Sequence, residues 1–391
     1  MKAMLKLFFI SLPFYFTSDF RLNIGSLSIT LNIIVLLLIT IMLFFIKKSI
    51  LKINKKDIPL FFILILFLML HLFSYNINLN DILYLKHIVH IFLALIFFYI
   101  SYIIGYKFIN TNNFNMYVKL FIYSSTILLI MYIYVYIFIL HAPFLGILLN
   151  NNELTTAGKN QAQLFIALSF PLLLGILNKN IIIILCLFVY LFATIYIGSR
   201  GLWVSLAVSL FIFLILKKKH LFIVMSSFFK SLVIAIIITV ITLGLFNVKI
   251  NYNVFNEAID AFSKLILLYE GQDNSDSSVS EREIFIKQGI ANLADKPILG
   301  NGLGYFLVNN PYEKVSHNDY IFLLSDMGLL GFIVYILFII VLNYRLKYTY
   351  YFYYLLPFFI DLLFVNAYTV PLFWILSGLY LGQASQMKKG E

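Results

Sequence analysis

Residues 221–246 read LFIVMSSFFKSLVIAIIITVITLGLF and contain one charged side chain, Lys230. A helix of about 20 mostly apolar residues is long enough to cross the roughly 30 Å of hydrocarbon in a bilayer. Lys217, Lys218 and Lys219 stand shortly before this stretch, and cytoplasmic loops of membrane proteins carry an excess of Lys and Arg. The stretch therefore predicts a membrane-spanning helix that begins in the cytoplasm and ends on the external side.

The composition extends this interpretation to the whole chain. Of its 391 residues, 62% are hydrophobic and 12% are charged, whereas a soluble domain is about 25% charged. A soluble protein could not bury so much apolar surface, which excludes soluble enzymes, nucleic-acid binders and disordered chains. The net charge of +11 is explained by an excess of Lys and Arg in cytoplasmic loops and not by binding to nucleic acid. The single cysteine, Cys186, excludes a disulfide within the chain.

The hydrophobic pattern predicts an all-α polytopic membrane protein with about 12 transmembrane helices. The fold has three parts: residues 1–246 with the first nine helices, an external (periplasmic) loop over 247–317 with short amphipathic helices, and residues 318–391 with the last three helices. The expected spans are 5–17, 24–46, 58–74, 82–106, 117–140, 161–178, 180–197, 202–216, 221–246, 318–342, 350–365 and 367–383.

The distribution of positive charge predicts the orientation. If the chain starts inside, 17 of the 28 Lys and Arg residues fall in cytoplasmic stretches, most of them very short loops. Six others belong to the long loop 247–317, and long loops cross the membrane largely regardless of charge. Both termini are therefore expected in the cytoplasm.

The long external loop contains two predicted helices. Residues 254–266 repeat apolar side chains at helical spacing, which favours an amphipathic helix that lies on the outer leaflet or packs on the bundle. Ser280 and Glu283 have the spacing of a capping box and start a second helix, which runs to about Ala294 and ends before Pro297.

Two other features of this loop resemble ligand sites but are interpreted structurally. Asp273 and Asp276 lie in a polar Ser/Asn-rich tract, which is typical of a solvated turn and not of a metal site. Gly300, Gly302 and Gly304 have no preceding strand, so close backbone packing explains them better than a nucleotide-binding loop does. The sequence predicts neither a metal nor a cofactor.

Polar residues on the external side form the candidate site. Arg200 lies in the turn between two expected spans, Arg282 in the second loop helix, and His317 directly before the tenth span. Lys159 precedes the sixth span on the same side. Arginines bind phosphate groups by forked hydrogen bonds, and a histidine can act as a base near neutral pH. These residues are expected to converge on one external site.

The same residues carry a family resemblance. The chain resembles the O-antigen ligase and polymerase family of bacterial surface-glycan enzymes. The resemblance rests on the motifs that follow, taken in their order along the chain: Asn160-Gln161, Ser199-Arg200-Gly201, Glu281-Arg282-Glu283-Ile284-Phe285, Lys296–Phe306, His317-Asn318-Asp319-Tyr320 and Leu324–Gly331, with Asp326 where the family commonly has an acidic residue.

This resemblance implies a metal-independent membrane glycosyltransferase of lipopolysaccharide biosynthesis in the bacterial inner membrane. Its donor is a glycan on undecaprenyl diphosphate, and its acceptor is a hydroxyl of lipid A–core or of another glycan. By position in the motifs, Arg200 and Arg282 bind the donor diphosphate, and His317 takes the proton of the acceptor. Lys159, Asn160, Asn318, Asp319 and Asp326 are expected to support them.

Two alternatives remain open in the sequence. A surface polysaccharide polymerase of the same family would need the same diphosphate site and base, and would differ from a ligase only in its acceptor. A transporter or flippase of lipid-linked glycan would place charges within the membrane, as Lys86 and Asp361 could do. The ligase is preferred because the loop after the ninth helix carries both Arg282 and His317.

Overall fold

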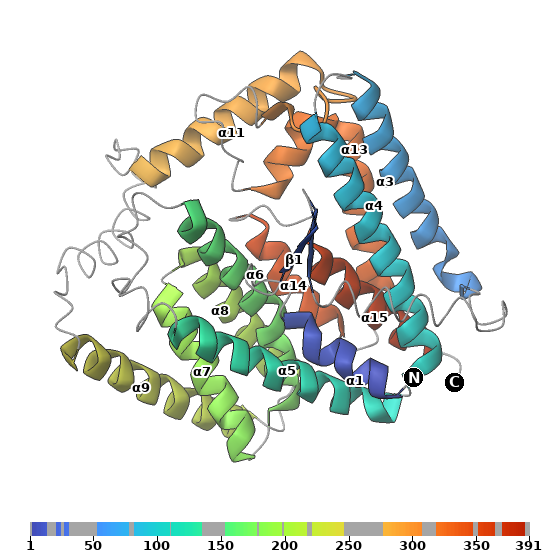
Figure 1. The fold of residues 1–391 in the computed structure, drawn as a ribbon. Coiled ribbons are helices and arrows are strands. Elements are labelled where there is room, and N and C mark those ends of the chain that lie inside the picture. Colours follow the sequence, from blue (N-terminus) through green and yellow to red (C-terminus); the bar gives the residue numbers. More distant parts are fainter. Residues whose placement is uncertain are drawn as a thin grey trace.

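The protein is described here by a computed structural model (Figure 1), in which nearly all described residues outside one hairpin are helical. The structure describes residues 2–13, 21–24, 27–30, 53–77, 82–109, 111–134, 153–177, 180–197, 199–216, 221–245, 277–306, 318–346, 351–363 and 370–387. The elements, in chain order, are α1 (Lys2–Ser11), β1 (Arg21–Ile24), β2 (Leu27–Thr30), η4 (Lys55–Asp57), α3 (Ile58–Ile77), α4 (Ile82–Ile103), η5 (Ile104–Phe108), α5 (Thr111–Tyr134), α6 (Glu153–Ile176), α7 (Ile181–Ile197), α8 (Arg200–Leu216), α9 (Leu221–Leu245), α11 (Ser277–Asp295), α13 (Asp319–Leu346), α14 (Tyr351–Asp361) and α15 (Pro371–Met387).

Four segments among the described residues are long and apolar enough to cross a membrane. They are Lys55–Phe73, Ile91–Phe108, Asn113–Met131 and Asp319–Leu346. Shorter apolar helices occupy Gln163–Ile176, Ile181–Ile195, Gly201–Ile215 and Met225–Ile238. The chain is thus a helical membrane protein, and the count of twelve spans stays a prediction. The expected span 350–365 is a half-length helix, because the 11 residues of α14 cover only about 16 Å at 1.5 Å per residue.

The expected span 24–46 is wrong at its beginning. Ile24 belongs to β1, and β2 pairs with β1 in an antiparallel hairpin with Arg21 opposite Thr30 and Ile24 opposite Leu27. A signal for this hairpin is present in the sequence, because Gly25-Ser26 separates two short runs, and a two-residue separation of this kind favours a hairpin. The rest of the expected span, and the expected helix over 254–266, lie outside the described residues.

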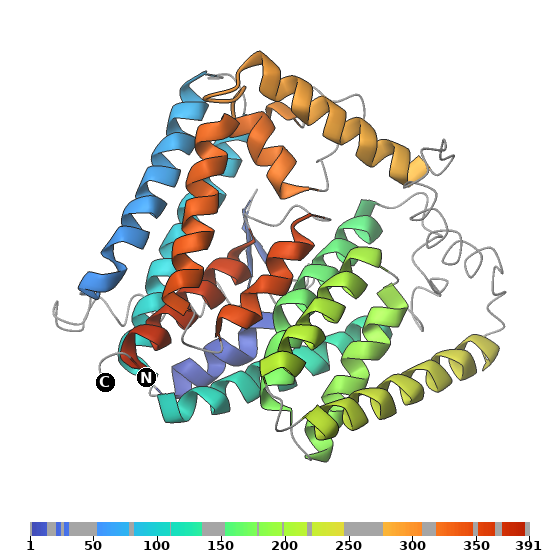
Figure 2. The same ribbon diagram turned by 180° about the vertical axis from the view of Figure 1, so that it is seen from behind.

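Two groups of helices make up the molecule. One contains α3, α4, α15 and most of α13, and the other contains α5 to α9 with α1 and α14 (Figures 1 and 2). The helix α11 crosses one end of the molecule and packs on α13. Segments far apart in the sequence are therefore neighbours at that end.

The contact between α4 and α15 shows how the first group packs. A Cβ atom at Gly105 would lie 2.5 Å from the carbonyl oxygen of Leu379, so only glycine fits this approach, which is typical of close helix pairs in membranes. The π-helical turn η5 ends this helix with Ile109 as its C-cap, and the last carbonyls of a helix have no partner within it. The Gln383 side chain donates to the carbonyls of Gly105 and Ile109, each at 2.6 Å, and so satisfies them where water is absent.

The helix α13 is broken at Gly328, which has φ 62° and ψ −167°. We call residues 319–327 the short arm and residues 329–346 the long arm, and Figures 1 and 2 show the two arms meeting at an angle. The 18 residues of the long arm extend for about 27 Å, close to the thickness of the hydrocarbon. The expected span 318–342 lies within Asp319–Leu346, which is long and apolar enough to cross a membrane, but its first third is a separate short helix.

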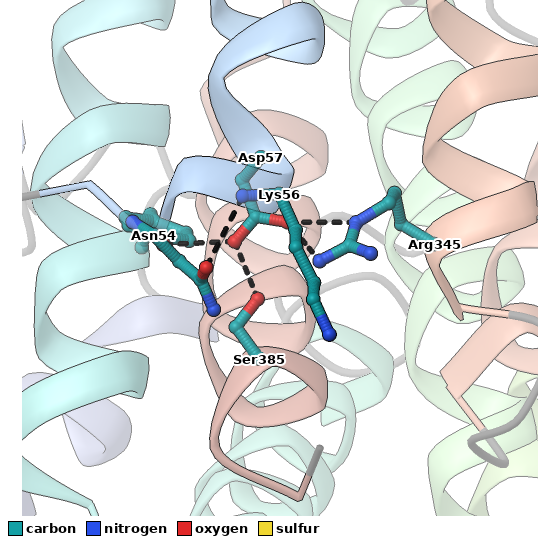
Figure 3. A network of polar contacts seen from close by, with 6 residues as sticks. Asn54, Lys56, Asp57, Arg345 and Ser385 are labelled. Atoms are coloured by element: carbon teal, nitrogen blue, oxygen red, sulfur yellow. Dashed lines mark hydrogen bonds and ion pairs between the residues drawn. The ribbon is translucent and has the colours of Figure 1, made fainter. Parts of the chain in front are cut away.

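A buried ionic contact closes the opposite end of the first group (Figure 3). Asp57 is fully buried, and one of its carboxylate oxygens accepts from Arg345 Nε at 2.7 Å. The other oxygen accepts from Ser385 Oγ at 2.5 Å and from the Tyr102 hydroxyl at 2.9 Å. The carboxylate thereby joins η4, α4, α13 and α15 at the end that the charge pattern assigns to the cytoplasm.

We expect Asp57→Ala to lower the free energy of unfolding by about 3–5 kcal/mol, because it leaves Arg345 in a largely buried site without its partner. Thermal unfolding of the detergent-solubilised protein measures this loss. Lys56→Ala is the control, since Lys56 is exposed beside Asp57 and its loss should change stability by less than about 0.5 kcal/mol. Equal stability of the two variants would contradict a stabilising role of the contact between Asp57 and Arg345.

Candidate functional site

The candidate site lies where the start of α8 meets the middle of α6. Ser199 precedes α8, and its hydroxyl donates to Gln163 Oε1 on α6 at 2.5 Å. The same hydroxyl accepts from Leu202 N at 3.4 Å, and the Ser199 carbonyl accepts from Trp203 N at 3.2 Å. Ser199 is therefore the N-cap of α8, and Arg200 is the first residue of that helix.

Gln163, ten residues after the start of α6, lies next to the start of α8 and is buried against Ser199. Lys159 and Asn160 lie on α6 about one turn before Gln163. Their convergence with Arg200 on one site stays a prediction. Gln163 was not among the residues predicted from the sequence, because a glutamine at the start of an apolar run gives no specific signal.

Hydrogen bonds through α14 connect this end of α8 with the beginning of α13. Ser205 Oγ of α8 donates to the carbonyl of Pro357 at 3.2 Å. Two residues further along α14, the Tyr320 hydroxyl donates to the carbonyl of Phe359 at 2.9 Å. The backbone N–H of Asp319 donates to the carbonyl of Leu362 at 3.0 Å. The half-length helix α14 therefore ends where the short arm begins.

Asn318 and Asp319 have structural positions at the start of the short arm. Asn318 Oδ1 accepts from the backbone N–H groups of Tyr320 at 3.0 Å and Ile321 at 3.1 Å, which makes Asn318 the N-cap. Asp319 is fully buried in the first turn, where the helix dipole favours a negative charge. His317 directly precedes Asn318 in the sequence and lies outside the described residues.

The helix α11 runs beside the short arm in the same direction. Asn292 Nδ2 donates to Ser325 Oγ at 2.8 Å, and one turn earlier Gly289 packs so closely on Ile321 that a Cβ atom would collide with its side chain. Arg282 lies two turns before Gly289, on the same face of the helix. At 1.5 Å per residue it is about 10 Å before Gly289, while Asn318 is about 4.5 Å before Ile321.

The start of α11 differs from the expectation. The helix begins at Ser277, so Ser280 is an internal residue and the expected capping box is not the N-terminus. Glu283 instead forms an exposed ion pair with Lys287 at 2.6 Å, one turn further along, and this hydrogen bond raises the pKa of Lys287. Arg282 is consequently in the second turn of the helix.

Asp326 connects α13 to the glycine-rich turn. It is fully buried; its carboxylate accepts from the backbone N–H groups of Gly304 at 2.6 Å and Phe306 at 3.0 Å, and its carbonyl accepts from Gly302 at 2.8 Å. The amides that could have bound a phosphate are therefore engaged within the protein. The expected packing role of Gly300–Gly304 is confirmed, and Asp326 has a structural role.

This turn also positions α11. The Phe306 ring packs on Phe285 of α11 with 5.9 Å between ring centroids, and on Phe322 of the short arm at 6.3 Å. Asn301 Nδ2 donates to the carbonyl of Asn292 at 2.5 Å. Asp326 thus fixes the glycine turn. The turn in turn positions α11, which carries Arg282, against the short arm, which follows His317.

Among the described residues, no group of three His, Cys, Asp or Glu side chains could hold a metal ion. The expected carboxylates Asp273 and Asp276 lie outside those residues.

We expect Asp326→Ala to destabilise the protein by about 2–4 kcal/mol, because it leaves the buried N–H groups of Gly304 and Phe306 without an acceptor. Limited proteolysis should cut the 296–306 segment faster, and the unfolding temperature should fall. Asp295→Ala, which removes an exposed carboxylate at the end of α11, is the matched control and should behave like the unaltered protein.

Comparison with known proteins agrees with the geometry. The family model described as O-antigen ligase matches residues 183–336, a range that includes Arg200, Arg282, His317 and Asp326. No curated protein matches the chain. The matched range spans α7 to the long arm of α13, which contains the glycine turn and the broken helix. The chain is thus similar to the O-antigen ligase family over residues 183–336.

Proposed function

We propose that the protein transfers a glycan from undecaprenyl diphosphate to an acceptor hydroxyl of lipid A–core on the external face of the inner membrane. Arg200 and Arg282 bind the donor diphosphate. Lys159 adds a positive charge beside them, and Asn160 adds hydrogen-bonding capacity. His317 takes the proton of the acceptor. No nucleotide sugar and no metal takes part.

The proposed reaction is a single displacement at the anomeric carbon. The acceptor oxygen forms a bond to that carbon as the bond to the diphosphate oxygen breaks, and the electron pair leaves with undecaprenyl diphosphate. The proton of the acceptor hydroxyl passes to His317. Negative charge grows on the leaving diphosphate, where two arginines stabilise it more strongly than they stabilise the bound donor.

The observation that carries this proposal is the meeting of separate helices at one end of the molecule. The Ser199–Gln163 hydrogen bond joins the start of α8 to α6, and the contacts of Asp319 and Tyr320 join the short arm to α14. Helix N-termini favour anions, and α8 and the short arm begin here. On α11, Arg282 lies two turns before Gly289, which packs against Ile321 of the short arm.

A gel of surface glycolipid from a deletion strain, run beside its undecaprenyl-linked pool, tests the acceptor. The ligase proposal expects bare lipid A–core and long glycan retained on the carrier. Lipid A–core with one repeat unit and no long chain would instead assign a polymerase, the alternative within the family. Lipid-linked units held on the cytoplasmic face would assign a transporter and overturn the proposal.

Variants expressed in that strain test the residues. Arg200→Lys should lower transfer by about 10²–10³-fold, because a lysine cannot form the forked contact, and His317→Ala should be at least as impaired. Lys287→Ala is the control, since Lys287 is an exposed cation on α11 that pairs with Glu283. All variants should reach the membrane in equal amounts, and full activity of Arg200→Lys would contradict the forked contact.

A further inference from the structure

The connection between α11 and the glycine turn ends in an exposed apolar tip. We define the tip as Lys296, Pro297, Ile298 and Leu299. The side chains of Ile298 and Leu299 are 66% and 48% exposed, respectively. Both are large and aliphatic, and they are adjacent in a segment that reaches the surface beside the break in α13.

The tip continues an apolar surface of the long arm. Leu329, Ile333, Leu337 and Ile340 are each 44–55% exposed and recur at helical spacing, so they form one stripe along the arm. The long arm belongs to a candidate membrane span, and an exposed apolar stripe on such a helix faces lipid. The stripe begins at Leu329, directly after the break.

Backbone hydrogen bonds fix the tip at the beginning of that stripe. The first two N–H groups of the long arm, those of Leu329 and Leu330, donate to the carbonyls of Pro297 at 2.9 Å and Ile298 at 3.1 Å. The tip thus provides the acceptors that a helix N-terminus lacks. Side chains of the tip and of the first turn of the long arm are therefore at the same depth.

The backbone of the tip is also suited to a medium with little water. The carbonyl of Lys296 accepts from Gly300 N at 3.0 Å, so three successive carbonyls have partners within the protein. Pro297 has no N–H group to satisfy. Irregular backbone at the edge of the hydrocarbon is tolerated only where its polar groups are satisfied internally.

We propose that the tip inserts into the external leaflet of the membrane, with Ile298 and Leu299 among the upper acyl chains and Lys296 at the level of the lipid phosphates. Lysine near a membrane boundary extends its charged end to the interface. Because the tip directly follows α11, its insertion holds the C-terminal end of that helix at the membrane surface. This inference is independent of the proposed transfer reaction.

Fluorescence quenching tests the depth of the tip. In a Cys186→Ala background, Ile298→Cys is labelled with an environment-sensitive fluorophore and the protein is reconstituted into phosphatidylethanolamine–phosphatidylglycerol vesicles. Lipids brominated near the top of the acyl chain should quench this label at least twofold more than they quench a label at Lys287→Cys. Aqueous iodide should show the reverse order. Leu299→Cys gives a second position should Ile298→Cys fail to fold.

Two controls make the result decisive. A label at Ile340→Cys, on the exposed stripe of the long arm, should respond to bromines placed deeper in the acyl chain. Lys287 is exposed on α11 and reports the aqueous side. Iodide quenching of the tip label equal to that at Lys287 would overturn the proposal. Protection from both quenchers would also overturn it, because protein would then cover the tip.

Discussion

The backbone contact between Gly300 and Gly328 is the constraint on which the end of the protein predicted to be external depends. A Cβ atom at Gly328 would lie 2.5 Å from the nitrogen of Gly300, and both residues have positive φ angles, a conformation that side chains disfavour. The contact breaks α13 into two arms and places the glycine turn in the break. Asp326 then fixes the turn from one side, and the carbonyls of the tip cap the long arm from the other.

The break also explains how a membrane span and a site can share one helix. An unbroken helix of 28 residues would extend for about 42 Å, well beyond the hydrocarbon. The long arm alone matches the membrane, and the short arm turns back beside α11 toward α14. Residues next to the candidate base therefore lie among helix ends.

Different interactions organise the two ends of the molecule. At the end assigned to the cytoplasm, the Asp57 carboxylate is enclosed by donors from three helices, and this holds the α3, α4, α13 and α15 group together. At the end predicted to be external, α8 and α6 belong to the other group, whereas α11 packs on α13. The proposed diphosphate site thus draws Arg200 from that group and Arg282 from α11, so the packing between them sets their separation.

The amino-acid sequence indicates that the chain is a helical membrane protein, where most helices lie, and which family its motifs resemble, because apolar length and charge bias act locally along the chain. It also indicates that the glycines pack closely. The hydropathy pattern did not predict the hairpin at residues 21–30, the true start of α11, the half-length α14 or the break at Gly328. Hydropathy alone continues smoothly through Gly328, because its neighbours are apolar. The break becomes visible only in the folded structure, since the atoms that require it belong to Ile298 and Gly300, which are distant in sequence and meet Gly328 only after folding.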